Sequence, residues 1–218
     1  MKERLNKLLP VLFVVVFALS RIPGWLPLNF SAIYAFAFCA GVYFRGALAW
    51  WLPLGTMLAT DMALNFYYSS QGIEVWNEAN LKNLFFNYVA YAVLIFLGRR
   101  FKPQSSFASL LGGGLLGAII FYLVTNTASW FFNPFHNAEY TKTFAGWLLA
   151  LTKGVSGWPT TWEFFRNTLL SGGLFTALFV GAEKLTSAAE SPVEKNAGVR
   201  EPERETEPDE AEASGAKT

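Results

Sequence analysis

The sequence contains few of the residue types that build metal, redox or nucleophilic sites. Among 218 residues there is one cysteine, Cys39, and one histidine, His136. A single cysteine inside an apolar stretch excludes an intramolecular disulfide, a thiolate zinc cluster and an iron–sulfur centre. One imidazole without further ligands at suitable spacing makes a poor metal site. We therefore expect no metal and no other cofactor, and we expect His136 in a surface loop.

Charged residues are scarce as well. They make up 15% of the chain against 53% hydrophobic residues, with a mean hydropathy of +0.30, and this composition argues against a soluble globule. Residues 1–186 hold only seven acids. Because an active site would need a nucleophile–base pair or a carboxylate cluster, we predict that the chain is not an enzyme. The formal net charge is only +1, and no nucleic-acid partner is expected.

Long apolar segments dominate what is present. Crossing a hydrocarbon core takes roughly 20 predominantly apolar residues, and interfacial aromatic residues can complete a shorter span. Six segments qualify, the first two of them short: 8–20, 30–44, 47–66, 84–97, 107–124 and 164–185. This pattern predicts an all-α membrane protein, a six-transmembrane-helix bundle over residues 1–186 that is in contact with the lipid bilayer.

The basic residues predict the orientation of this bundle, since positive flanks stay in the cytoplasm. Three of them precede the first segment, one lies between the second and third, and three lie between the fourth and fifth. Both termini are therefore expected on the cytoplasmic side of the membrane. The first segment also has the pattern of a signal peptide, with Ala18-Leu19-Ser20 at a cleavage spacing, and this alternative stays open.

The last part of the chain has a different composition. Residues 187–218 hold nine acids and four basic residues with hardly any large apolar side chain. Such a segment cannot offset the entropy of ordering itself, so a disordered acidic cytoplasmic tail is expected. Its composition favours a solvated extension over a docking segment.

Polar and aromatic residues gather on the outer side. Asp61 lies in the outer third of the third segment with Asn65 one turn later, and an ionisable group at that depth indicates a functional site. Its alternative role is a structural salt bridge to Arg21 or Arg166. Six of eight tryptophans also fall at or beyond the outer boundary, where an interfacial anchoring role is the alternative.

Two outer connections contain further candidates. Asn126, Trp130 and Asn133 share a face if the fifth helix continues that far, and carboxamides beside indole suit an uncharged heteroaromatic ring. The alternative is that these residues cap the helix and turn the chain at Pro134. Residues 145–151 predict a short apolar helix at the outer interface.

A helix start follows, with Thr160 and Glu163 forming a capping box. Arg166 then stands in the first turn of the helix, where a cation opposes the helix dipole. It therefore needs a compensating carboxylate, from the protein or from a substrate; Asp61 is the expected partner, and a substrate anion is the second candidate.

These observations predict a small-solute pocket that opens to the outside. Amides would match ring heteroatoms, indoles would stack, and Asp61 with Arg166 would set charge selectivity. The substrate-binding residues we expect are Asn29, Asp61, Asn65, Trp76, Asn126, Trp130, Trp158, Trp162 and Arg166. A non-transporting membrane scaffold is the main alternative, and a membrane enzyme or a self-sufficient carrier are weaker ones.

Several segments carry a family resemblance: Arg21-Ile22-Pro23, Asn29-Phe30-Ser31-Ala32, Ala59-Thr60-Asp61, 125–130 and 157–167. Together they resemble a family of uncharacterised bacterial integral membrane transport proteins over roughly residues 10–185. The six-span layout is also similar to the substrate-binding (S) components of energy-coupling-factor vitamin importers. That similarity implies a vitamin or precursor bound between the outer loops, and a coupling transmembrane subunit with ATPases as partner.

One feature of the first helix departs from the S components, which carry small residues spaced by four there for docking. Residues 11–20 offer only Ala18 and Ser20. Either the docking surface has moved, for example to Ala37 and Gly41, or the chain has no such partner.

Overall fold

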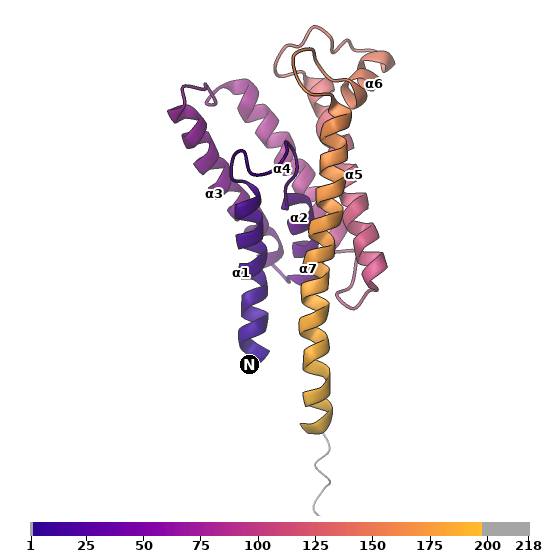
Figure 1. The fold of residues 1–218 in the computed structure, drawn as a ribbon. Helices are drawn as coiled ribbons and strands as arrows, with labels where there is room; N and C mark the ends of the chain where they lie inside the picture. The colour runs from indigo at the N-terminus through magenta and orange to yellow at the C-terminus, as the bar shows by residue number, and fades with distance from the viewer. Residues whose placement is uncertain (1, 198–218) are drawn as a thin grey trace, which may run out of the picture.

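The computed structural model describes residues 2–197 as an elongated bundle of helices (Figure 1). Within this range there are seven helices and no strand, so the prediction of an all-helical chain is confirmed. The helices are α1 (Lys2–Ser20), α2 (Ile33–Tyr43), α3 (Leu48–Ser70), α4 (Glu78–Gly98), α5 (Phe107–Phe132), α6 (Phe144–Thr152) and α7 (Thr161–Ala197).

Six of the helices run up and down the bundle in turn, and α6 lies at one end (Figure 1). Residues 71–77 and 133–160 connect helices at the end that holds α6, which we call the loop end. The beginning of α1 and the end of α7 lie towards the opposite end, which we call the terminal end. The short connections 44–47 and 99–106 also lie towards the terminal end.

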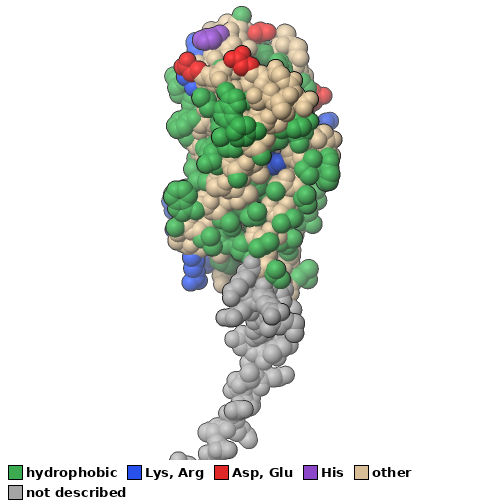
Figure 2. Space-filling view, turned by 90° about the vertical axis from the view of Figure 1, so that its left-hand side faces the viewer, with side chains coloured by type: hydrophobic (Ala, Val, Ile, Leu, Met, Phe, Trp, Pro, Cys, Tyr) green, Lys and Arg blue, Asp and Glu red, His purple; other side chains and the backbone are tan. Residues whose placement is uncertain are grey.

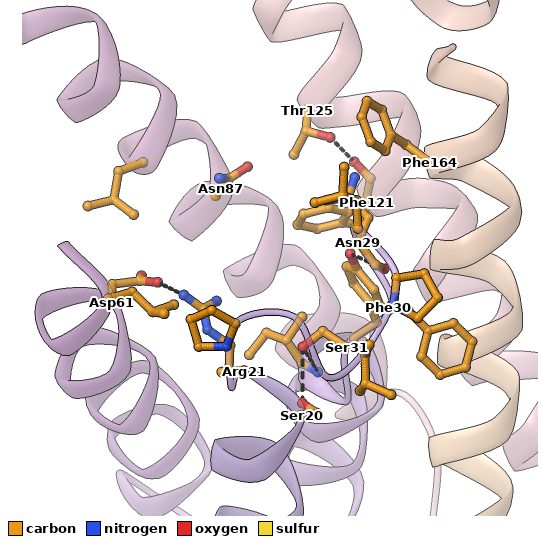
Figure 3. Close-up of a pocket in the computed structure, with 18 of the residues that line it drawn as sticks. Ser20, Arg21, Asn29, Phe30, Ser31, Asp61, Asn87, Phe121, Thr125 and Phe164 are labelled. Carbon is orange, nitrogen blue, oxygen red and sulfur yellow. Dashed lines mark hydrogen bonds and ion pairs between the residues drawn. The ribbon is translucent and has the colours of Figure 1, made fainter. Parts of the chain in front are cut away.

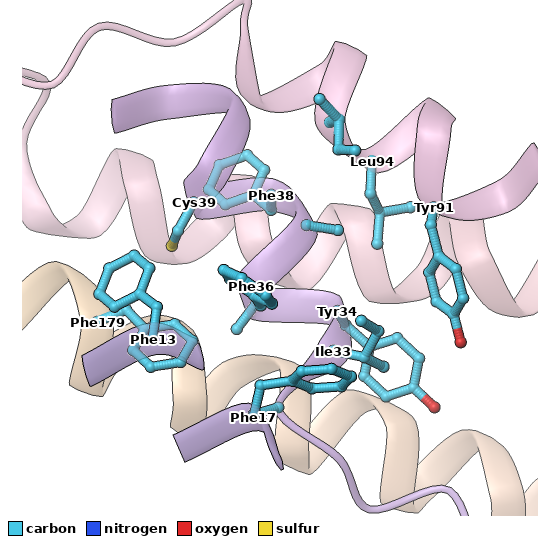
Figure 4. Packing of buried hydrophobic residues seen from close by; sticks show 14 of the residues in the cluster. Phe13, Phe17, Ile33, Tyr34, Phe36, Phe38, Cys39, Tyr91, Leu94 and Phe179 are labelled. Atoms are coloured by element: carbon cyan, nitrogen blue, oxygen red, sulfur yellow. The ribbon is translucent and has the colours of Figure 1, made fainter. Parts of the chain in front are cut away.

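Helix α2 forms the centre of the bundle. Every residue from Ile33 to Val42 is buried, as expected for a helix that is apolar on all sides. Phenylalanine rings pack around it: Phe17 of α1 lies 5.5 Å from Phe36 between ring centroids, and Phe13 stacks on Phe179 of α7 at 4.0 Å (Figure 4). This core joins α1, α2 and α7, and it thereby fixes the position of the connection that follows α1.

Glycines allow the closest helix contacts. A Cβ atom on Gly98 of α4 would collide with the backbone of Phe38, and one on Gly41 of α2 would collide with the backbone of Ile95. Small residues allow helix backbones to approach in this way. Since Ala37 and Gly41 are both buried inside the bundle, the suggestion that they form a docking surface for a partner subunit is wrong.

Three described helices are long and apolar enough to cross a membrane: α4, α5 and residues Thr161–Ser187 of α7. Two shorter apolar helices cover Pro10–Ser20 and Ile33–Tyr43. Helix α3 has 23 residues, but its second half carries Thr60, Asp61, Asn65 and two tyrosines, which lower its hydropathy. The count of six spans is therefore not confirmed. In Figure 2 hydrophobic side chains cover much of the middle of the visible face, which indicates membrane association.

Two local predictions also have outcomes. The short apolar helix expected at 145–151 is confirmed as α6. Helix α7 continues to Ala197, past the expected domain boundary at residue 187. The rest of the expected tail, residues 198–218, lies outside the described residues.

Candidate functional site

A cavity of about 480 Å³ lies towards the loop end of the bundle (Figure 3). This volume falls in the range of small-molecule sites in proteins. Its walls come from residues 20–34, the second half of α3, residues 83–91 of α4, the second half of α5 and the start of α7. The polar lining residues are Ser20, Arg21, Asn29, Ser31, Tyr34, Asp61, Tyr68, Asn83, Asn87, Tyr91, Thr125, Asn126 and Ser129.

The α1–α2 connection, residues 21–32, forms one wall of this cavity. Gly24 and Asn29 adopt left-handed backbone angles, with φ of 79° and 59°, which let the chain turn back on itself. Ser20 Oγ accepts a hydrogen bond from the backbone N–H of Ala32 at 3.0 Å, which ties the two ends of the connection together. The Asn167 side chain of α7 donates to the carbonyl of Leu28 at 2.9 Å. The connection is therefore fastened at both of its ends and to α7.

An ion pair lies at one side of the cavity. The guanidinium of Arg21 pairs with Asp61 Oδ1 (Figure 3). The hydroxyl of Tyr88 donates to Asp61 Oδ2 at 3.0 Å. Asp61 is 8% exposed. The expected pairing of Asp61 with Arg166 is wrong, because Arg166 is exposed on α7 and makes no ion pair with a described residue. Asp61 pairs with Arg21, the other cation that the sequence offered.

Three carboxamides line the cavity from the helices facing the ion pair. Asn83 and Asn87 are one turn apart on α4, and Asn126 comes from α5. Asn126 Nδ2 donates to the carbonyl of Tyr122 at 2.9 Å, which leaves its carbonyl oxygen available. Among the described residues, the side-chain amides of Asn83 and Asn87 have no hydrogen-bond partner. Donors and acceptors therefore remain open to a guest.

Aromatic rings form the deep part of the lining. Tyr91 of α4 stacks on Phe121 of α5 with ring centroids 5.0 Å apart and an interplanar angle of 18°. Tyr34 of α2 lies 4.8 Å from the same Phe121 ring. These rings pack against one another and supply the apolar part of the cavity wall.

A second cavity of about 410 Å³ adjoins the first and shares Asn83, Asn126, Ser129 and Phe164 with it. Its other walls are the connections before and after α6, including Trp158. A hydrogen bond joins these connections, since the backbone N–H of Ser156 donates to Glu139 Oε1 at 3.3 Å. Backbone donors, first its own N–H and then that of Ser156, lower the pKa of the Glu139 carboxyl.

The structure separates the nine predicted site residues. Asn29, Asp61 and Asn126 line the first cavity, and Trp158 and Asn126 line the second. Asn65, Trp76, Trp130, Trp162 and Arg166 line neither. Their surroundings explain why: Trp76 packs edge-on against Phe66, Trp130 Nε1 donates to the carbonyl of Thr141 at 2.7 Å, and Trp162 is 60% exposed.

The stripe expected on α5 is interrupted by the end of the helix. Helix α5 stops at Phe132, and Asn133 is its C-cap residue with a left-handed φ of 40°. The Asn133 side chain accepts from the N–H of Asn137 at 2.8 Å, so the capping alternative is right for Asn133. The capping box is confirmed as well, because Glu163 accepts from the N–H of Thr160 at 2.8 Å.

The sequence reasoning missed Asn83 and Asn87 as site residues. Their spacing of four, continued by Tyr91, places three polar groups on one face of an otherwise apolar helix, and this signal was readable. Among the side chains that the structure describes, no group of three or more His, Cys, Asp or Glu could hold a metal ion. His136 is exposed in its loop, as expected.

Comparison with known proteins yields one match. The model of the "Family of unknown function (DUF6580)" matches residues 1–194. No curated protein and no solved structure matches the chain. Because the family match covers most of the 218 residues, the chain belongs to the DUF6580 family.

Proposed function

We propose that this protein is a membrane-embedded component that binds a small solute for import, similar in plan to the S components of energy-coupling-factor transporters. The observation that carries the proposal is the cavity of about 480 Å³, whose side-chain amides at Asn83 and Asn87 have no partner among the described residues. These amides are half-buried in the cavity wall, so a polar guest that enters the cavity meets free donors and acceptors.

The proposed topology has six spans in a bacterial cytoplasmic membrane, with both termini inside. Three long apolar helices support it, and the short helices α1 and α2 run up and down between neighbours. The basic residues Arg45, Arg99 and Arg100 lie in connections at the terminal end, which supports a cytoplasmic position for that end. The cavity would then open outward.

A non-transporting scaffold is the second candidate. The exposed tryptophans favour it, since Trp25 and Trp158 are 67% and 70% exposed and Trp162 is 60% exposed, as in an interfacial belt. A scaffold, however, needs no cavity lined by open carboxamides. An enzyme has less support, because Asp61 is paired with Arg21 and His136 lies in an exposed loop outside the first cavity.

Small molecules that co-purify with the protein test the proposal. Wild type, Asn87→Leu and the control Asn65→Leu are purified in parallel and extracted for mass spectrometry. We expect one compound to be enriched with wild type and with the control, and to fall about five- to 150-fold with Asn87→Leu, because leaving a hydrogen-bonding group without its partner costs about 1 to 3 kcal/mol. Equal enrichment in all three preparations, or no enriched compound at all, would contradict the proposal.

A further inference from the structure

The charged groups of the first cavity are few and paired. Arg21 and Asp61 are the only charged residues in its lining. Arg21 binds one carboxylate oxygen of Asp61, and the Tyr88 hydroxyl donates to the other. The formal charge of the wall is therefore zero, and both carboxylate oxygens of Asp61 already have partners inside the protein.

Among the described residues, no charged side chain besides Arg21 and Asp61 lines the cavity. Arg166 does not line the cavity. Glu74, Glu78 and Lys82 line a separate hollow near the loop end. A charged guest would therefore meet no counter-charge in the cavity wall. Burying an ion without a counter-charge is unfavourable, so the cavity disfavours charged guests.

The uncharged polar groups of the wall include both hydrogen-bond donors and hydrogen-bond acceptors. The carboxamides of Asn83 and Asn87 each offer donors and an acceptor, and Asn126 keeps a free carbonyl oxygen. The rings of Tyr91 and Phe121, which stack on each other at 5.0 Å, line the cavity beside them. This combination matches a planar ring that carries both donors and acceptors.

We propose that the cavity takes an uncharged, ring-containing solute that both donates and accepts hydrogen bonds. This inference rests on the proposed function and narrows its substrate class. It replaces the sequence-based idea that Asp61 and Arg166 select the charge of the solute. Phosphorylated and carboxylated forms of the solute, and its cationic analogues, should be rejected.

Three probes with one ring and different charge test this inference: benzamide, benzoate and benzamidine, which are neutral, anionic and cationic at pH 7. Retention of each radiolabelled probe by the purified full-length protein in lipid nanodiscs is measured by equilibrium dialysis. We expect benzamide to be retained at least about tenfold more than either ion. Benzoate or benzamidine retained as well as benzamide, or better, would overturn the inference while the proposed function still stands.

Two variants report the role of the ion pair. Asp61→Asn leaves the Arg21 cation unpaired, and it should raise benzoate retention relative to benzamide at least about tenfold. Arg21→Gln leaves the Asp61 carboxylate unpaired and should favour benzamidine to a similar degree. Unchanged ratios in both folded variants would also overturn the inference.

If wild type retains none of the probes, the net charge of the compound that co-purifies with wild type tests the inference instead. A neutral ring compound supports the inference, and a compound with net charge at pH 7 overturns it. An extract without any enriched compound contradicts the proposed function itself, and the inference then fails with it.

Discussion

The guanidinium of Arg21 pairs with the carboxylate of Asp61, 40 positions later in the chain. Arg21 is the first residue after α1, and Asp61 lies in the second half of α3. The Tyr88 hydroxyl of α4 donates to the same carboxylate. The buried carboxylate of Asp61 therefore links the α1–α2 connection, α3 and α4 beside the cavity.

Breaking this pair should destabilise the protein. Asp61→Asn is expected to lower the free energy of unfolding by about 3 kcal/mol, because it leaves a partly buried guanidinium without its counter-charge. The double variant Arg21→Gln/Asp61→Asn should lose less than the two single losses added together, since no unpaired charge remains. Denaturant unfolding in detergent micelles measures the free energy of unfolding of the two single variants and of the double variant.

The control for this experiment is the exposed pair of Lys82 and Glu78, one turn apart on α4. Lys82→Gln should change the free energy of unfolding by about 0.5 kcal/mol or less. If Asp61→Asn costs no more than this control, the ion pair does not hold the connection to α3.

The crossing of α2 and α4 should not tolerate a methyl group. In Gly98→Ala the new Cβ would meet the backbone of Phe38, and backbone cannot move aside as a side chain can. We expect a loss of at least about 2 kcal/mol in the free energy of unfolding. Gly55→Ala on α3 is the matched control, because nothing lies within 4 Å of its Cβ. That substitution should be neutral or stabilise by up to about 1 kcal/mol. Equal effects of the two substitutions would show that the close crossing is absent.

The orientation can be tested with introduced cysteines, since the one native cysteine, Cys39, is buried. Gln104→Cys places an exposed thiol at the terminal end and Ala138→Cys places one at the loop end. In intact cells a membrane-impermeant maleimide should label Ala138→Cys and spare Gln104→Cys, and permeabilised cells should label both. Wild type, which keeps only Cys39, is the background control. Labelling of Gln104→Cys in intact cells would show that the terminal end faces outward and would contradict the proposed topology.

Acid should loosen the connections around α6. The pKa of Glu139 is lowered in the folded protein by its own backbone N–H and that of Ser156. A group with a depressed folded pKa contributes stability above its unfolded pKa of about 4.3, and this contribution disappears as the pH falls through the folded pKa. We therefore expect wild type to become more sensitive to proteolysis within residues 133–160 as the pH drops from 5 to 3. The Glu139→Gln variant should be equally sensitive to proteolysis at pH 5 and at pH 3. A wild-type cleavage pattern that does not change with pH would contradict this role of Glu139.

The helices themselves could be predicted because they depend on neighbouring residues in sequence. The apolar runs 107–124 and 164–185 lie within α5 and α7, and the capping box of Thr160 and Glu163 begins α7 where expected. The boundaries were less certain, since polar residues such as Asn126 continue α5 into the region that the pattern assigned to a connection.

The site was predicted only in part, for a physical reason. A tryptophan at the outer boundary has the same sequence signature whether it faces a cavity or the surroundings, so Trp158 could not be told apart from Trp76 or Trp162. The spacing of Asn83 and Asn87 showed a polar face on α4, but not which helix that face meets.

The sequence by itself determined the apolar character of the chain, its helical class and the start of α7 at the capping box, because these follow from composition and from contacts within a few residues. The tertiary structure decided which distant groups meet. Only the packing of α1, α3 and α4 around α2 brings Arg21, Tyr88 and Asp61 together. Pairing a charge depends on distance in space, and a linear sequence with two possible cations, Arg21 and Arg166, does not contain that distance.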